Sequence, residues 1–469
     1  GQGRRQSGGY MEQFVDRELE IRTLGKEYAK KEASLVVVYG RRRVGKTTLL
    51  SEFMKGKSAL YFLATQEAET INRAAFQEKA ADFTGNDFLA EVSVDKWDTI
   101  FKAIVSAKWE TKPVLIIDEF QYLGKANPAF PSVFQRIWDE ILMKSSVMVI
   151  LCGSLISMMV SQTLSYGSPL YGRRTAQIRL KQIPFRYYRE FCPALSRKGQ
   201  IERYAVTGGV PKYIESFSDC TDIFAGIEEN ILNRTGYLYE EPHFLLQQEV
   251  SEVGGYFSVL RAIAFGRTKL SEIASFMEAK ATDLTRTLKT LIELDLVHRE
   301  VPITEENPEK SKKGLYRITD YYIRFWFTMI YPNQGDIEQG NITYVMEKIK
   351  KSFVRSHAAF VYEDVCREEL SARQDLPCHF SKIGRYWDKN TEIDIVALNE
   401  EEGIILFGEC KYWSGQVDVD VFYQLQEKAG RVPWHKGSRR ELYCIFSMSG
   451  FSARLRELAE SRDDLILSE

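Results

Sequence analysis

Gly40-Arg41-Arg42-Arg43-Val44-Gly45-Lys46-Thr47 directly follows the apolar run Leu35–Tyr39. This order predicts a buried strand that leads into a phosphate-binding loop, because glycines let backbone N–H groups turn inward and the next helix presents its positive end. Lys46 is expected to reach the β and γ phosphates and Thr47 to ligate Mg²⁺, with Thr48 in the same cofactor-binding set. The loop therefore predicts binding of ATP or GTP.

A second apolar run ends in two carboxylates. Val114–Ile117 is followed by Asp118 and Glu119. At a strand tip, one carboxylate would hold Mg²⁺ and its neighbour would polarise the attacking water. We therefore expect Asp118 to be a metal ligand and Glu119 and Lys46 to be catalytic. The alternative is that both runs are ordinary buried strands.

Length and composition limit the classes of protein. The chain has 469 residues, enough for about three domains. Its 44% hydrophobic and 27% charged residues are typical of a soluble protein, and a net charge of -2 gives no overall attraction to nucleic acid or anionic membranes. Any contact with nucleic acid must therefore come from local patches.

The cysteines and the chain start suggest a setting. Seven cysteines without a C-x-x-C pair indicate neither a disulfide framework nor a structural zinc site, which favours a reducing, cytoplasmic location. The longest apolar stretch, 147–160, is interrupted by glycine and serine and is shorter than the roughly 20 residues of a membrane span, so no membrane partner is expected. Residues 1–9 are interpreted as a cloning remnant, with the protein starting at Met11 and no signal peptide.

Hydrophobic patterning predicts an α/β, multidomain fold. In residues 11–198, strands at 35–39, 59–64, 114–117 and 147–151 alternate with helical segments, which predicts a mostly parallel sheet covered by helices on both faces. The loop at Gly40 and the pair Asp118-Glu119 then fall at carboxyl ends of strands, where open α/β sheets bind ligands. This part is expected to be a P-loop ATPase domain.

Three further domains are expected. Residues 199–250 read as a helical lid, and residues 251–333, with short helices followed by a hairpin around a charged tip, have the outline of a winged helix. The polar, glycine-containing segment 333–340 is expected to be a linker. Residues 341–469 form a second α/β unit, with strands at 393–398, 403–408 and 441–447.

A second candidate site lies in this last unit. Asp394 sits in an apolar run, and the strand 404–408 ends in Glu409-Cys410-Lys411. Strand alternation puts Glu409 and Lys411 on one face and Cys410 on the other. Two nearby carboxylates can bind Mg²⁺, and a lysine can stabilise an attacking hydroxide or a transition state. Glu363, on an amphipathic segment, is a further candidate, although it and the others also fit solvated strand ends and helix surfaces.

With both sites in view, the chain from Met11 onward resembles archaeal-type P-loop ATPases, relatives of the STAND and AAA-like enzymes, that carry a C-terminal restriction-endonuclease-like domain of the PD-(D/E)XK type. The resemblance implies ATP and Mg²⁺ as cofactors. It places the N-terminal segment 14–18, with Arg17, near the base of the nucleotide. It assigns magnesium binding and the role of general base in catalysis to residues 118–121. Ser154 resembles the sensor of the γ phosphate. Arg173 resembles an arginine that completes the site, in cis or from a neighbouring subunit, and Pro211 belongs to a turn similar to the adenine-contacting turn of the lid.

The nuclease resemblance has departures. No proline precedes Asp394, and Cys410 fills a position where an apolar residue is common, although cysteine tolerates burial. Such folds also exist as inactive binding modules. Catalysis by Asp394, Glu409 and Lys411, with Asp394 and Glu409 as metal ligands, is therefore an expectation with an open alternative.

Two hypotheses follow for the function. The first is an ATPase whose nucleotide state controls a nucleic-acid-processing, Mg²⁺-dependent nuclease-like module, with DNA favoured over RNA. The second is an ATP-switched regulatory scaffold whose C-terminal domain binds without cutting. A homo-oligomer would fit an arginine supplied in trans.

The winged helix is a third candidate site. Arg286 and Lys289 lie on the helix expected to face a groove, and the wing contains Lys310, Lys312 and Lys313. Acidic residues are nearly as numerous as basic ones in residues 251–324, so an intramolecular role is favoured over reading of a DNA sequence.

Overall fold

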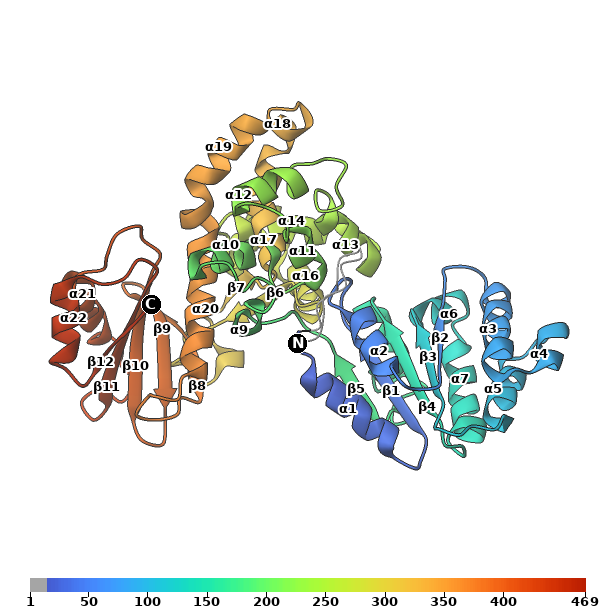
Figure 1. Ribbon diagram of the computed structural model, residues 1–469. Helices are drawn as coiled ribbons and strands as arrows, with labels where there is room; N and C mark the ends of the chain where they lie inside the picture. The colour runs from blue at the N-terminus through green and yellow to red at the C-terminus, as the bar shows by residue number, and fades with distance from the viewer. Residues whose placement is uncertain (1–14) are drawn as a thin grey trace. The chain divides into compact units, whose positions relative to one another are not determined.

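The computed structural model describes residues 15–469 as two compact units (Figure 1). The first comprises residues up to 183 together with 210–215, and the second comprises residues 184–209 and 216–469. The expected start at Met11, the remnant 1–9 and Phe14 of the N-terminal segment lie outside the described residues.

A five-stranded, all-parallel sheet forms the centre of the first unit. Its strands are β1 (Ser34–Tyr39), β2 (Ala59–Leu63), β3 (Val114–Asp118), β4 (Met148–Gly153) and β5 (Ala176–Arg179), in the order β2-β3-β4-β1-β5. The predicted parallel sheet is confirmed, and β5 is an additional strand at its edge. All strands point the same way, so the loops after β1, β3 and β4 gather at one edge.

Helices cover this sheet because its strands are apolar on both faces. Val36, Val38 and Ile116 pack against α1 (Glu18–Ala29) and α2 (Lys46–Met54). Val37 and its odd-numbered neighbours point the other way and are equally buried. The remaining helices of the unit are α3 (Glu69–Thr84), α4 (Asp87–Glu91), α5 (Trp97–Ser106), α6 (Gln121–Ala126), α7 (Phe130–Ile137), α8 (Ile156–Met159) and α11 (Pro211–Ser216).

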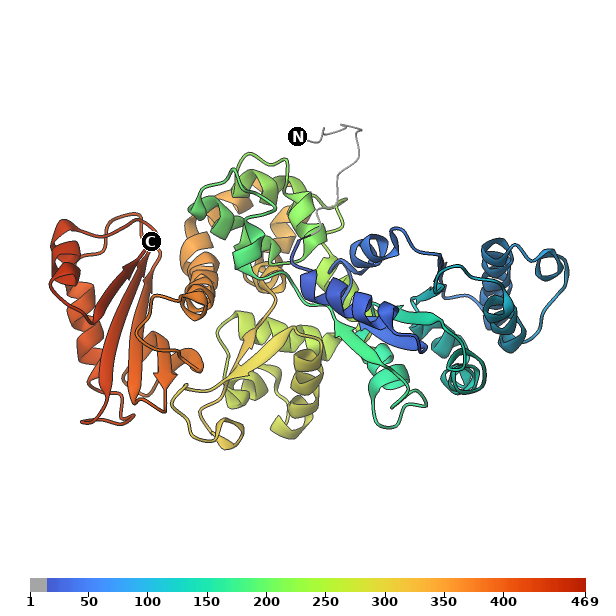
Figure 2. The same ribbon diagram turned by 60° about the horizontal axis from the view of Figure 1, so that its bottom comes forward.

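The second unit begins with a helical region, and its role as a lid stays a prediction. Its helices are α9 (Phe185–Tyr188), α10 (Arg197–Thr207), α12 (Ile223–Gly226) and α13 (Glu241–Glu249). Three helices and an antiparallel hairpin follow: α14 (Val253–Ala264), α15 (Leu270–Met277), α16 (Ala281–Glu293), β6 (Val297–Glu300) and β7 (Leu315–Ile318) (Figure 2). That this part is a winged-helix domain stays a prediction. After β6, Ile303 packs on Gly384 and its N–H donates to the Arg385 carbonyl at 2.9 Å, which favours an intramolecular role for the hairpin.

The segment 333–340, expected to be a linker, is largely helical. The segment contains α18 (Gln334–Glu338), preceded by α17 (Tyr321–Phe325). Ile337 is fully buried, and Glu338 accepts hydrogen bonds from Tyr239 and Arg234. The segment is thus a short helix with one buried apolar side chain.

A mixed five-stranded sheet ends the chain. Its order is β12-β11-β10-β9-β8, with β8 (Lys382–Trp387), β9 (Glu392–Asn399), β10 (Ile404–Lys411), β11 (Arg440–Ser447) and β12 (Leu465–Ser468). β11 pairs in parallel with both β10 and β12, whereas β9 pairs antiparallel with both β8 and β10. Figures 1 and 2 show α21 (Val419–Ala429) and α22 (Ala453–Glu460) along one face. Helix α20 (Ala359–Ala372), preceded by α19 (Ile342–Phe353), lies against β8, β9 and β10.

Among the described residues, no helix has both the length and the apolar character that a bilayer crossing requires.

Candidate nucleotide site and C-terminal pocket

The loop after β1 has the backbone that its glycines predict. Gly45 has a φ of 99° and Arg43 a φ of 71°, both in the left-handed region. A Cβ on Gly40 would lie 2.6 Å from the Leu180 carbonyl oxygen, so this position has no room for a side chain. The loop is therefore tightly curved and packed against the end of β5.

Lys46 lies at the centre of this loop. Its ammonium donates to the carbonyls of Gly40 and Arg41 at 2.9 and 3.1 Å. Burial lowers the pKa of Lys46, and the carboxylates of Glu119 and Asp118 oppose that shift. Thr47 is exposed in the first turn of α2, and Thr48 is half-buried. The ammonium is thus held among carbonyls that a triphosphate could replace as its partner.

Arg17 supports the loop from behind. Its side chain is 6% exposed, and it donates to the carbonyls of Val44 at 3.0 Å and Lys181 at 2.9 Å. Burial lowers the pKa of this guanidinium, while Glu20 and Asp16 oppose that shift. These contacts make Arg17 a brace of the loop, and its predicted position near the base stays a prediction.

The predicted turn at 209–211 lies beside the loop. Arg41 donates to the Tyr213 hydroxyl at 2.9 Å, and a Cβ on Gly45 would lie 3.7 Å from Pro211 Cγ. Pro211 is therefore next to the phosphate-binding loop, while adenine contact stays a prediction. Arg42 and Arg43 are half-buried, and Val44 is buried.

The carboxylates after β3 are held in place. Asp118 accepts from the Glu119 N–H at 2.8 Å and from the Tyr61 hydroxyl. Glu119 has a φ of 53° and accepts from Ser154 Oγ at 2.9 and 3.0 Å and from the Gln121 amide. Ser154, at the tip of β4, thus contacts the predicted general base, and Asp118 and Glu119 act on the charge of Lys46. The structure thus brings Lys46, Asp118, Glu119 and Ser154 together.

Arg173 lies elsewhere in the same unit. It pairs with Asp139 at 3.2 Å. Thr175, two residues later, hydrogen-bonds Leu35 at the start of β1, so Arg173 belongs to the amino-terminal edge of the sheet, opposite the loop. The pairing of β5 with β1 thus gives no support to the idea that Arg173 completes the nucleotide site of its own chain. A role in a neighbouring subunit stays a prediction.

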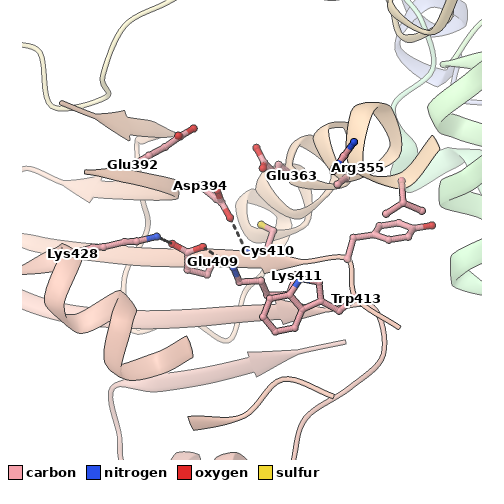
Figure 3. Close-up of a pocket in the computed structure, with 12 residues that line it drawn as sticks. Arg355, Glu363, Glu392, Asp394, Glu409, Cys410, Lys411, Trp413 and Lys428 are labelled. Atoms are coloured by element: carbon pink, nitrogen blue, oxygen red, sulfur yellow. Dashed lines mark hydrogen bonds and ion pairs between the residues drawn. The ribbon is translucent and has the colours of Figure 1, made fainter. Parts of the chain in front are cut away.

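The second unit contains a pocket of about 420 Å³ at the end of its sheet (Figure 3). Asp394 from β9, Glu409 and Lys411 from β10, and Glu363 from α20 all line it. Asp394 Oδ2 accepts from the Cys410 N–H at 3.0 Å, which ties the two strand ends together. The structure therefore brings all four predicted residues to one pocket.

A buried carboxyl, Glu409, and a half-buried one, Glu363, are easily protonated in this pocket. Burial, reinforced by the charge of Asp394, raises the pKa of Glu409 to about 8. The same causes raise the pKa of Glu363 to about 7, against the opposing charges of Arg385 and Arg367. Glu409 lies 3.0 Å from Lys428 Nζ and 3.8 Å from Lys411 Nζ. Desolvation and mutual repulsion thus favour proton uptake by these carboxyls, and a bound cation would compete with those protons.

Within residues 15–469, no three His, Cys, Asp or Glu side chains gather closely enough to hold a metal by themselves. Asp394 and Glu409 are two, and Arg385 holds Glu363 at 2.7 Å. Because Mg²⁺ is commonly bound by one or two carboxylates plus substrate phosphates, this donor set fits such an ion.

Sequence reasoning missed three residues of these sites. Tyr61 contacts Asp118, Lys428 contacts Glu409, and Arg385 contacts Glu363. Each is an ordinary residue in its own element. Only Lys428 could have been suspected from the sequence, because it lies close to apolar positions on the inner side of α21.

The fold and the loop define a P-loop ATPase domain joined to further α/β structure. Residues 14–217 match a family model described as an ATPase domain predominantly from Archaea, and residues 326–429 match one described as archaeal and bacterial proteins of unknown function.

The chain is 37% identical over 411 residues to the uncharacterized protein MJECL04 of Methanocaldococcus jannaschii, covering 87% of this chain and 89% of that protein. It belongs to this family, in which an archaeal P-loop ATPase domain is joined to that C-terminal region. The Walker-type ATPase PABY2304 of Pyrococcus abyssi is similar at 18% identity and a TM-score of 0.49, over 67% of this chain and 96% of that one. The ORC2 protein of Aeropyrum pernix is similar at 16% identity and a TM-score of 0.41, over 72% and 98%.

Proposed function

We propose that this ATPase hydrolyses ATP with magnesium and that its nucleotide state controls a C-terminal nuclease-like module that acts on nucleic acid, DNA in preference to RNA. The observation that carries the proposal is the convergence of Asp394, Glu409 and Lys411 on one pocket, in a chain that also has an intact phosphate-binding loop. The proposed division is 11–198, 199–250, 251–333 and 341–469.

In the ATPase domain, the chain's own residues bind and orient the nucleotide. Lys46 exchanges its carbonyl partners for β and γ phosphate oxygens, while the loop amides supply further donors. Thr47 and Asp118 would hold the magnesium ion, which neutralises phosphate charge when bound. Glu119 accepts a proton from the attacking water, and Ser154 and Gln121 fix its orientation.

In the C-terminal pocket, Asp394 and Glu409 would hold a second magnesium ion. Such an ion would orient a water and neutralise charge on a phosphodiester. Lys411, 4.9 Å from the Trp413 ring, is placed at the pocket wall to stabilise negative charge on the reacting phosphate. Burial and the charge of Asp394 raise the pKa of Glu363 to about 7, so Glu363 can gain or lose a proton in the neutral pH range.

The test is cleavage of labelled DNA and RNA by the purified chain in magnesium, with and without ATP. We expect cleavage that Lys411→Ala abolishes. Lys389→Ala, which removes an exposed lysine from the β8–β9 turn, is the matched control. If the wild type cuts nothing in any nucleotide state, the nuclease half is wrong.

The ATPase half has its own test. Lys46→Ala should lose ATP binding and hydrolysis, whereas Glu119→Gln should keep binding and lose about 100-fold or more in turnover, because it removes the proton acceptor. Unchanged turnover in both variants would refute this half.

The ion pair of Lys428 with Glu409 favours a second candidate: an ATP-switched scaffold whose pocket binds without cutting. An ammonium 3.0 Å from the carboxylate can replace a metal as its counter-charge. In that case Lys411→Ala is silent, and an ATP analogue changes the oligomer size in gel filtration, with Lys46→Ala abolishing the change.

A further inference from the structure

A stripe of cations runs along α19 and the short π-helix, Val354–Ala358, that continues it. Lys348, Lys351 and Arg355 are spaced three and four residues apart, so they lie on one helix face. All three are exposed, and none is in an ion pair with another described residue. Tyr344, one turn earlier on the same face, is 51% exposed and lies 4.6 Å from Lys348 Nζ. We call Lys348, Lys351 and Arg355 the α19 stripe.

The α19 stripe leads to the C-terminal pocket. Arg355 lines that pocket, together with Val354 and Ala359 from the same helical run. Trp413, which follows β10, lines it as well and is 46% exposed. In the view of Figure 3, Arg355 and Trp413 both lie toward the end of the pocket away from Lys428.

The pocket lining contains charges of both signs, whereas the α19 stripe is positive throughout. The interior holds Glu363, Glu392, Asp394 and Glu409 against Lys411 and Lys428. An ionised carboxylate repels a phosphate, so positive charge at the rim of the pocket helps a polyanion to approach. Lys348 and Arg355 are about 10 Å apart along the helix, from the rise of about 1.5 Å per residue. That length admits successive phosphates of one strand, each paired with a cation.

We propose that the α19 stripe binds the sugar-phosphate backbone of a single nucleic acid strand and leads it to the pocket, where a base stacks on Trp413. This inference rests on the proposed function, because it identifies how the substrate of that pocket is bound. The pocket volume of about 420 Å³ is that of a small-molecule site, which suits one unstacked nucleotide better than a duplex. A partly exposed indole provides a stacking surface that tolerates any base.

The experiment measures fluorescence anisotropy of a labelled 20-nucleotide strand, with EDTA present so that nothing is cut, as salt is varied. The variant is Lys348→Ala/Lys351→Ala/Arg355→Ala. Each phosphate contact on a single strand contributes about -0.7 to the slope of log affinity against log salt, so the variant's slope should be smaller in magnitude by about 2. Its affinity should fall about tenfold or more.

The matched control removes three exposed cations from the winged helix: Lys280→Ala/Arg286→Ala/Lys289→Ala. We expect it to bind as the wild type does. Both variants should keep the wild-type melting temperature and ATP hydrolysis rate, and Lys348→Arg/Lys351→Arg/Arg355→Lys should keep the affinity and the slope. Trp413→Ala should weaken binding while Trp413→Phe largely restores it, and a blunt duplex should bind more weakly than the strand.

Binding that is lost in the winged-helix control and kept in the stripe variant would overturn the inference. So would tighter binding of the duplex than of the strand, or no binding by the wild type. Cleavage is scored separately in magnesium. Binding that depends on the α19 stripe, without cleavage, would refute the proposed nuclease activity but not the proposed binding by the stripe. Cleavage that the stripe variant leaves unchanged would refute binding by the stripe but not the nuclease activity.

Discussion

Arg17→Ala should destabilise the ATPase domain. Arg17 donates to two carbonyls, one in the phosphate-binding loop and one beyond β5, at 3.0 and 2.9 Å. Hydrogen bonds to a charged group contribute about 1.5–3 kcal/mol each, and both carbonyls would lose a buried partner. Burying the guanidinium has a cost that offsets part of this sum, as its lowered pKa indicates. We therefore expect a net loss of about 3 kcal/mol in the free energy of unfolding.

The assay is scanning calorimetry, with ATP titration on the same samples. For a domain of this size, about 3 kcal/mol corresponds to a fall in melting temperature of roughly 6–12 °C. ATP affinity should also fall, because the Val44 carbonyl is no longer fixed. Arg17→Lys, which reaches fewer acceptors, should be intermediate. The control is Arg22→Ala, an exposed arginine on α1, with an expected change within about 0.5 kcal/mol. Equal melting of Arg17→Ala and Arg22→Ala would refute the bracing role.

Three further results are expected. Gly40→Ala should lower the melting temperature and weaken ATP binding, because its Cβ would lie 2.6 Å from a backbone carbonyl oxygen. Gly25→Ala, in a helix with open space around it, should raise the free energy of unfolding by about 0.5–1 kcal/mol. Both are measured by calorimetry, and a Gly40→Ala protein as stable as the wild type would contradict the loop geometry. Ser154→Ala should slow hydrolysis with ATP affinity unchanged, as measured by turnover and titration, and equal turnover would show that Glu119 needs no such support. The pKa of Glu409 is raised in the fold to about 8 from 4.5, so the folded state binds the extra proton between these values. In EDTA, this contribution to the free energy of unfolding should be fully present below pH 4.5 and be lost as pH rises through about 8. Glu409→Gln should flatten this decline in melting temperatures measured across the pH range. An equally steep decline in the variant would contradict the raised pKa of Glu409.

Much of the ATPase fold could be predicted because its central strands are continuous apolar runs. β1, β3 and β4 are fully buried, and sequence patterns report burial well. β5 was missed because it is a four-residue edge strand that contains Gln177 and Arg179. β8 and β12 also lie at sheet edges, where partial burial weakens the apolar signal.

In the candidate sites, residues of short motifs could be predicted, whereas residues brought together only by folding could not. Residues within short motifs, such as Lys46 and Glu409, could be predicted from spacing alone. Tyr61 and Asp118 are 57 positions apart in the chain, and only pairing of β2 with β3 makes them neighbours. The position of Arg173 at the far edge of the sheet likewise depends on β5 pairing with β1.

Titration calorimetry of the full chain with ATP and magnesium tests the central claim most directly. We expect one saturable binding event in the wild type, absent in Lys46→Ala, since that variant removes the ammonium at the centre of the loop. A wild type that releases or absorbs no heat across the titration, or a Lys46→Ala protein that binds as tightly as the wild type, would contradict the account.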